Sequence, residues 1–111
     1  MTERAKKYLS DILIAIDLIE SFMKDITGFN EYSGDAKTKS AVERQLGIIG
    51  EAVNKYRNEQ DAFELSHTKA IIQFRNRLVH SYDSVDDSII WAIVRLHLPP
   101  LKVEVQKYLE D

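Results

Sequence analysis

Apolar residues recur along this chain with the spacing of an α-helix, and that period constrains the fold more than any other feature. Between residues 4 and 27 they are separated by steps of four, three, four and three, at Ile12, Ile16, Ile19, Met23 and Ile26. Charged residues occupy many of the positions between them, which is the pattern of an amphipathic helix. No segment shows the sustained alternation of a half-buried strand, so we expect an all-α fold.

The periodic segments divide the chain into five predicted helices. These cover residues 4–27, 36–57, a stretch that follows an N-cap at Ser66 and runs into segment 75–82, then 87–98 and 101–109. Residues that stop or cap helices lie between them, namely Gly28, Asp35, a turn with aspartates at 83–87, and Pro99-Pro100. The first two helices carry matching apolar stripes, which predicts an antiparallel pair. Together the segments predict one domain over residues 1–111, an up-and-down bundle of four to five helices.

Composition excludes several classes of site. The chain has no cysteine, which rules out disulfides, thiolate metal ligands and cysteine nucleophiles. His67 and His97 are thirty residues apart without a clustered third ligand, so we expect no metal and no cofactor. The absence of long apolar runs and targeting segments predicts a cytoplasmic protein without membrane contact. The net charge of −3 means that any nucleic-acid binding must rest on a local basic patch.

Segment 75–82 gathers side chains suited to phosphate chemistry, with Arg75, Asn76, His80 and Tyr82 at the end of a predicted helix. A guanidinium can hold a phosphate through two parallel hydrogen bonds, and an imidazole, with an ordinary pKa of about 6.5, exchanges protons near neutrality. Metal-free RNA cleavage requires that combination. His80 would withdraw a ribose 2′-hydroxyl proton, and Arg75 would stabilise the charge that develops on the phosphate.

Helical geometry restricts how these side chains can cooperate. Asn76 lies four residues before His80, on the same face, so its amide is placed to orient the imidazole. Arg75 and His80 are five residues apart, about 140° around an ideal helix, and cannot converge on one atom. Either the helix loosens before His80, or two protomers each contribute part of the site. A purely structural interpretation also exists, because polar residues at a helix end commonly satisfy the last carbonyl groups.

Residues elsewhere provide candidate supporting contacts. Gly47 and Gly50 lie inside a predicted helix, where each costs about 1 kcal/mol relative to alanine, so close approach by another helix or a ligand is expected. Glu51 is placed either to pair with Lys55 or to support Arg75. The candidate contacts to RNA phosphates are Arg77 and Arg44, with Arg57 and Lys69 as further possibilities. Tyr82 is suited to stack on a base. The aromatic residues Phe22, Phe29, Tyr32 and Phe63 are interpreted as bundle packing.

These motifs resemble the HEPN superfamily in its HepT-like form. The resemblance rests on the Arg-x4-His-x-Tyr motif at Arg75, His80 and Tyr82, with Asn76 after the arginine, and it covers nearly the whole chain. It includes segment 48–52 with Glu51, and segment 87–101 with its tryptophan and Leu-Pro. An isolated Arg-x4-His arises often by chance, whereas the combination is specific.

The resemblance implies a HEPN-like helical bundle that forms a homodimer, with the motifs of two protomers lining one cleft. It implies a metal-independent endoribonuclease, the toxin of a type VII-like toxin–antitoxin pair. The implied partner is a minimal nucleotidyltransferase antitoxin of the MntA-like kind, which transfers AMP to the motif tyrosine and so makes Tyr82 an O-AMP-tyrosine. A second hypothesis is a non-catalytic helical binding module that is the partner or substrate of a nucleotidyltransferase.

Overall fold

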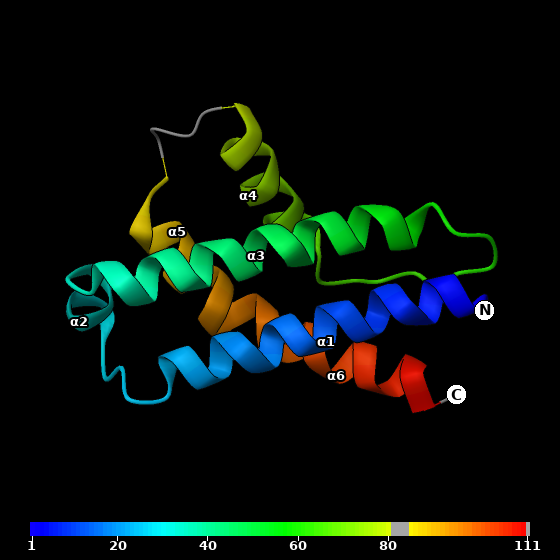
Figure 1. The fold of residues 1–111 in the computed structure, drawn as a ribbon, viewed down its shortest axis with the longest axis horizontal. Helices are drawn as coiled ribbons and strands as arrows, with labels where there is room; N and C mark the ends of the chain where they lie inside the picture. Colours follow the sequence, from blue (N-terminus) through cyan, green and yellow to red (C-terminus); the bar gives the residue numbers. More distant parts are fainter. Residues whose placement is uncertain (81–84, 111) are drawn as a thin grey trace.

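The computed structural model describes residues 1–80 and 85–110, and in these ranges it is built from helices without strands (Figure 1). The elements are α1 (Glu3–Met23), α2 (Phe29–Ser33), α3 (Ala36–Arg57), α4 (Lys69–His80), α5 (Asp87–Ala92), the π-helical segment η2 (Ile93–His97) and α6 (Leu98–Glu110). The predicted all-α bundle is confirmed. None of the described helices is both long and apolar enough to cross a membrane.

Helices α1 and α3 pack along each other in opposite directions and form the centre of the fold (Figure 1). The predicted apolar stripe of α3 is buried in full: Val42, Leu46, Ile49, Val53 and Tyr56. On α1 the stripe is buried from Ile12 to Ile19, whereas Met23 is only partly covered. The Asp35 side chain caps α3 by accepting a hydrogen bond from the Thr38 amide at 3.1 Å. The expected antiparallel pair and the bounds of the second helix are therefore confirmed.

Two predicted helix ends are wrong, and at each of them a glutamate side chain binds a backbone amide. Helix α1 stops at Met23, not near Thr27, and the Thr27 amide and hydroxyl instead donate to the Glu31 carboxylate at 3.2 and 2.6 Å. The intervening Gly28 has extended backbone and begins the short helix α2, which the sequence did not predict. Ser66 does not cap α4, because the helix starts only at Lys69, and the Ser66 amide instead donates to the Glu104 carboxylate of α6 at 2.9 Å.

The proline pair is expected from the sequence to stop the helix or to kink it sharply, and it does not stop it: both prolines stand in the first turn of α6, which follows η2 directly. Prolines are tolerated in a first turn, because their missing N–H groups are not needed there. The change in bonding falls just before them, where the Leu98 amide donates to the Ile93 carbonyl, five residues back. The predicted start of the fourth helix is confirmed, with Asp86 accepting a hydrogen bond from the Ser88 amide at 2.8 Å.

Two of the four aromatic residues predicted to pack lie in or against the core, Tyr32 and Phe22, whereas Phe29 and Phe63 are exposed. Tyr32 is buried, and its ring and that of Phe29 lie 5.9 and 6.0 Å from the ring of Trp91, which joins α2 to α5. Phe63 lies 5.2 Å from Tyr108 of α6, measured between ring centroids. These contacts fix both connections of α3, one before it and one after it, against the C-terminal helices.

Helix α4 crosses α3 at Gly50, where the two backbones approach closely. A Cβ atom added at Gly50 would lie 2.6 Å from Cβ and 2.8 Å from Cγ of Arg75. At Gly47, one turn earlier, the nearest atom to such a Cβ is Cδ1 of Leu78 at 3.5 Å, an ordinary contact. The expected close approach is therefore that of another helix, and only Gly50 depends on the absence of a side chain.

We expect Gly50→Ala to destabilise the protein by about 1–3 kcal/mol, because the added methyl group forces the base of the Arg75 side chain away from α3. Gly47→Ala is the matched control and should stabilise by up to about 1 kcal/mol through helix propensity. Urea unfolding followed by circular dichroism at one fixed protein concentration measures both. Equal effects of the two substitutions would contradict the close crossing at Gly50.

Candidate active site

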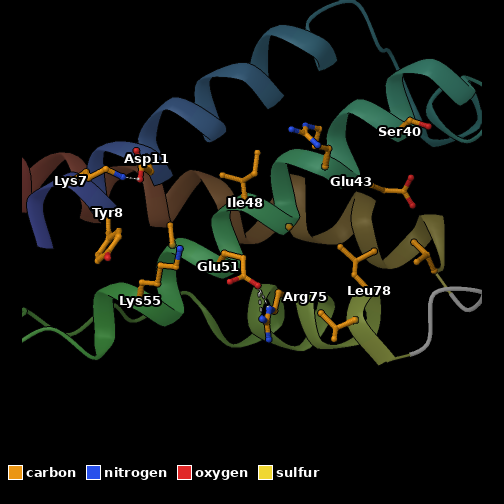
Figure 2. A pocket seen from close by; sticks show the side chains of 15 residues that line it. Lys7, Tyr8, Asp11, Ser40, Glu43, Ile48, Glu51, Lys55, Arg75 and Leu78 are labelled. Atoms are coloured by element: carbon orange, nitrogen blue, oxygen red, sulfur yellow. Dashed lines mark hydrogen bonds and ion pairs between the residues drawn. The ribbon is translucent and has the colours of Figure 1, made fainter. Parts of the chain in front are cut away.

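A groove of about 690 Å³ runs along α3 between α1 and α4 (Figure 2). Three of the predicted site residues line it, namely Arg44, Glu51 and Arg75. One side of α3, from Ser40 to Lys55, forms the floor of the groove. Helix α1 contributes Lys7 and Tyr8 at one end, and α4 contributes Arg75. The groove therefore joins residues that are nearly seventy positions apart in the sequence.

Arg75 is held in the groove by Glu51. Its Nε donates to Glu51 Oε1 at 2.7 Å, and its Nη2 lies 2.5 Å from the same oxygen (Figure 2). The stem of Arg75 rests on Gly50, the neighbour of Glu51 in the sequence, so one turn of α3 determines both the position and the direction of the side chain. Of the two partners that the sequence left open for Glu51, the structure selects Arg75.

The ion pair leaves part of the guanidinium free to bind an anion. Glu51 uses the Nε hydrogen and one Nη2 hydrogen of Arg75, so the outer edge with Nη1 keeps further donors. Nη1 also donates to Oδ1 of Asn76 at 3.4 Å, which is a long contact. A phosphate can therefore approach the outer edge while Glu51 keeps its own contacts. Half of the Glu51 side chain is exposed, so the pair stabilises the fold by no more than about 1 kcal/mol.

His80 lies apart from this groove. Helix α4 remains α-helical as far as His80, so the helix does not loosen before the imidazole within the described residues. The five-residue separation therefore keeps its angle of about 140°, with Arg75 half-buried against α3 and His80 exposed to solvent. Asn76 is exposed as well, and its amide oxygen is directed at Arg75. Within residues 1–80 and 85–110, no hydrogen bond joins Asn76 to His80.

The remaining candidates are dispersed over the surface. Arg44 lines the groove, whereas Arg77 is exposed on α4 outside it. Ser88 holds the pKa of the Asp86 carboxyl below its usual range by donating hydrogen bonds, and Arg77 adds a smaller effect, which places that cation near the start of α5. Arg57 and Lys69 are exposed. Tyr82 and the first residues of the predicted turn, 83 and 84, lie outside the described residues.

The groove is more basic than the protein around it. It carries four cationic side chains, Lys7, Arg44, Lys55 and Arg75, and three acidic ones, Asp11, Glu43 and Glu51, whereas the whole chain has a net charge of −3. Burial raises the pKa of the Glu43 carboxyl, and Asp87 raises it further. With one more cation than acid, the groove is a local basic patch of the kind that nucleic-acid binding by this acidic chain requires.

The residues of the groove that were not identified as site residues from the sequence include Lys7, Tyr8 and Lys55. Lys55 had been considered only as a partner for Glu51. A signal for it was present, because Arg44, Ile48, Glu51 and Lys55 are separated by steps of four, three and four, a second stripe beside the buried one. The contribution of α1 had no such signal, because it depends on how α1 packs against α3.

No group of three or more potential metal ligands occurs among the residues that the structure describes. The chemistry available in the groove is that of a fixed guanidinium, other cations and hydrogen-bonding groups. These groups bind anions and stabilise charge that develops on them.

Comparisons with known proteins identify the family of this chain. The family model described as "Ribonuclease HepT-like" matches residues 12–108. The protein named "Probable ribonuclease HepT" from Thermococcus cleftensis is 37% identical, over 96% of this chain and 97% of its own. "Putative RNase MJ1380" from Methanocaldococcus jannaschii is 35% identical, over 91% of this chain and 93% of its own. No solved structure matches. Because the family model spans most of the sequence, the chain belongs to the HepT-like ribonuclease family.

Proposed function

We propose that this protein is a metal-independent endoribonuclease whose active site is completed by two copies of the chain. Membership of the HepT-like ribonuclease family supports the reaction class. One observation supports the shared site above all others: α4 is a regular helix through both Arg75 and His80, which sends their side chains in different directions. A two-fold dimer brings His80 of one protomer to Arg75 of the other without distorting either helix.

The proposed reaction is an internal transesterification of RNA. His80 removes the proton of the ribose 2′-hydroxyl, and the oxygen attacks the adjacent phosphorus. The bond from phosphorus to the 5′-oxygen breaks, which leaves a 2′,3′-cyclic phosphate on one product and a 5′-hydroxyl on the other. The leaving oxygen takes its proton from water, so each site needs one His80 and one Arg75. The outer edge of the Arg75 guanidinium stabilises the negative charge that develops on the phosphate oxygens.

We further propose that the protein acts in the cytoplasm as the toxin of a toxin–antitoxin pair. The partner is a minimal nucleotidyltransferase of the MntA-like kind, which transfers AMP to Tyr82. Tyr82 is two residues beyond His80 in the sequence. A bulky anionic nucleotide at that position obstructs the shared cleft and repels the RNA backbone, which accounts for neutralisation.

Mixing two inactive variants tests the shared site. His80→Ala and Arg75→Ala should each lose RNA cleavage, measured with total RNA in the presence of a chelator. When the two variants are unfolded and refolded together, about half of the dimers are mixed, and each mixed dimer has one intact site, so about a quarter of the wild-type rate should return.

A site within one protomer would give no recovery, because every chain in the mixture carries one defect. The control for random pairing is native mass spectrometry of the refolded mixture, which distinguishes the two variants by mass and should find about half of the dimers mixed. Cleavage that survives in His80→Ala alone would contradict the proposed base.

Glu51→Ala tests whether the carboxylate positions Arg75. Loss of the carboxylate should lower KM, because one negative charge leaves the groove, and should lower kcat roughly tenfold to a hundredfold, because the guanidinium is no longer fixed. The free energy of unfolding should change by less than about 1 kcal/mol. A loss of activity proportional to a loss of stability, with kcat and KM unaltered in the folded fraction, would indicate a merely structural contact.

Adenylylation separates the toxin from the alternative of a non-catalytic module. Incubation with an MntA-like nucleotidyltransferase and ATP should add one AMP at Tyr82, detected by mass spectrometry, and should abolish RNA cleavage. Tyr82→Phe should remain unmodified. If AMP is transferred but the unmodified protein never cleaves RNA, the chain is a substrate or partner module and the catalytic proposal is wrong.

A further inference from the structure

We propose that the end of the groove at Tyr8 and Lys55 binds one nucleotide of a single-stranded RNA substrate, with its base stacked on the Tyr8 ring and its phosphate held by Lys55. This proposal rests on the ribonuclease function and extends it by naming single-stranded RNA as the class of substrate. Tyr8 and Lys55 are outside the motif that carries the chemistry.

The placement of the two residues supports a subsite next to the reacting phosphate. Tyr8, Lys55 and Arg75 line one groove, and Figure 2 shows Tyr8 and Lys55 toward one end, with the pair of Arg75 and Glu51 further along. Lys55 is one helical turn beyond Glu51 on α3, a rise of about 6 Å. A strand whose reacting phosphate lies at Arg75 can therefore continue along α3 toward Lys55.

Tyr8 has the properties of a fixed stacking platform. It is partly buried and packs against the hydrophobic core, so its ring loses little freedom when a base binds. Lys7 Nζ lies 5.5 Å from the ring centroid and 2.9 Å from Asp11 Oδ2. The hydrogen bond to Asp11 raises the pKa of Lys7, so the cation beside the ring persists at any pH of interest. Stacking on an aromatic ring is open to every base, because each base has a π-face.

Lys55 supplies a charge that nothing in the protein neutralises within the described ranges. Glu51, the acid one turn away on α3, is committed to Arg75, and Lys55 has no acidic partner within 4.0 Å among residues 1–80 and 85–110. The side chain is exposed and lines the groove. An ammonium group on a long, flexible stem is well suited to contact a backbone phosphate.

The arrangement favours a single strand over a duplex. A base can lie on Tyr8 only if one of its faces is uncovered, and in an A-form duplex both faces are stacked on neighbouring bases. The groove combines a backbone-binding cation with an aromatic ring, the combination used by proteins that bind single strands. Its excess of cations over acids is only one, so we expect modest affinity with strong dependence on the base at Tyr8.

Binding of fluorescent RNA oligonucleotides, measured by anisotropy in a His80→Ala background to prevent cleavage, tests the phosphate contact. Lys55→Gln should weaken binding several-fold and reduce the slope of log K against log salt by about 0.7, the value for one phosphate of a single strand. Lys107→Gln removes the same charge from an exposed position on α6 outside the groove and should change neither quantity.

A scan with abasic residues tests the stacking contact. In an otherwise unaltered site, one abasic position in the oligonucleotide should weaken binding by about 5- to 150-fold, the usual range for loss of one stacked base. Tyr8→Phe should behave in the same way, because the ring is kept. The Tyr8→Ala variant should bind the intact strand with the weak affinity that the unaltered site has for the abasic strand. An abasic position in the strand should then weaken binding to Tyr8→Ala no further.

The outcomes separate this subsite from the proposed ribonuclease function. RNA cleavage by the wild type, with no effect of Lys55→Gln or Tyr8→Ala on binding, overturns the subsite and leaves the function intact. Binding that depends on both residues without cleavage supports the subsite and overturns the function. Lys55→Gln could instead change dimerisation and leave RNA affinity unaltered. That result assigns this end of the groove to the contact between two copies of the chain and overturns the subsite. If Tyr8→Ala fails to fold, the effect of Lys55→Gln on RNA binding still tests the subsite.

Discussion

The contact between Gly50 and Arg75 is the constraint on which the rest of the site depends. A missing side chain on α3 lets α4 cross at close range, and the base of Arg75 fills the space that a Cβ atom would occupy. The next residue of α3, Glu51, then meets the guanidinium at the end of the same side chain. Packing and electrostatics thus act on one arginine from two adjacent positions, which explains why a partly exposed side chain has a defined direction.

The crossing of α4 over α3 also keeps Arg75 and His80 of one protomer apart. With Arg75 directed at α3, the regular turns of α4 carry His80 out to solvent. The groove along α3 consequently contains Arg75, together with Tyr8 and Lys55, whereas His80, the proton carrier in our proposal, lies outside it. The shared site that we propose rests on this regular helix geometry and requires no strained backbone.

The sequence predicted those features that depend on local periodicity. The buried stripe of α3, its aspartate cap and both of its ends were correct, because spacing and capping act over a few residues. The end of α1 and the start of α4 were wrong, because Glu31 and Glu104 bind backbone amides there, and the spacing of apolar residues does not place these carboxylates. For the same reason Glu51 was left between a local and a distant partner, and the role of Tyr8 could not be foreseen before α1 was placed against α3.

The connection from α3 to α4 has a consequence for motion. The Tyr56 hydroxyl donates to the Phe63 carbonyl and the Tyr108 hydroxyl donates to the Glu64 carbonyl, both at 2.7 Å, while Glu104 binds the Ser66 amide. Helix α4 is thus fixed before its first turn and again at the Gly50 crossing, whereas its last turn bears mainly exposed side chains. Amide hydrogen exchange should therefore quicken from the middle of α4 toward His80, so that the arginine keeps its place while the imidazole samples a range of positions.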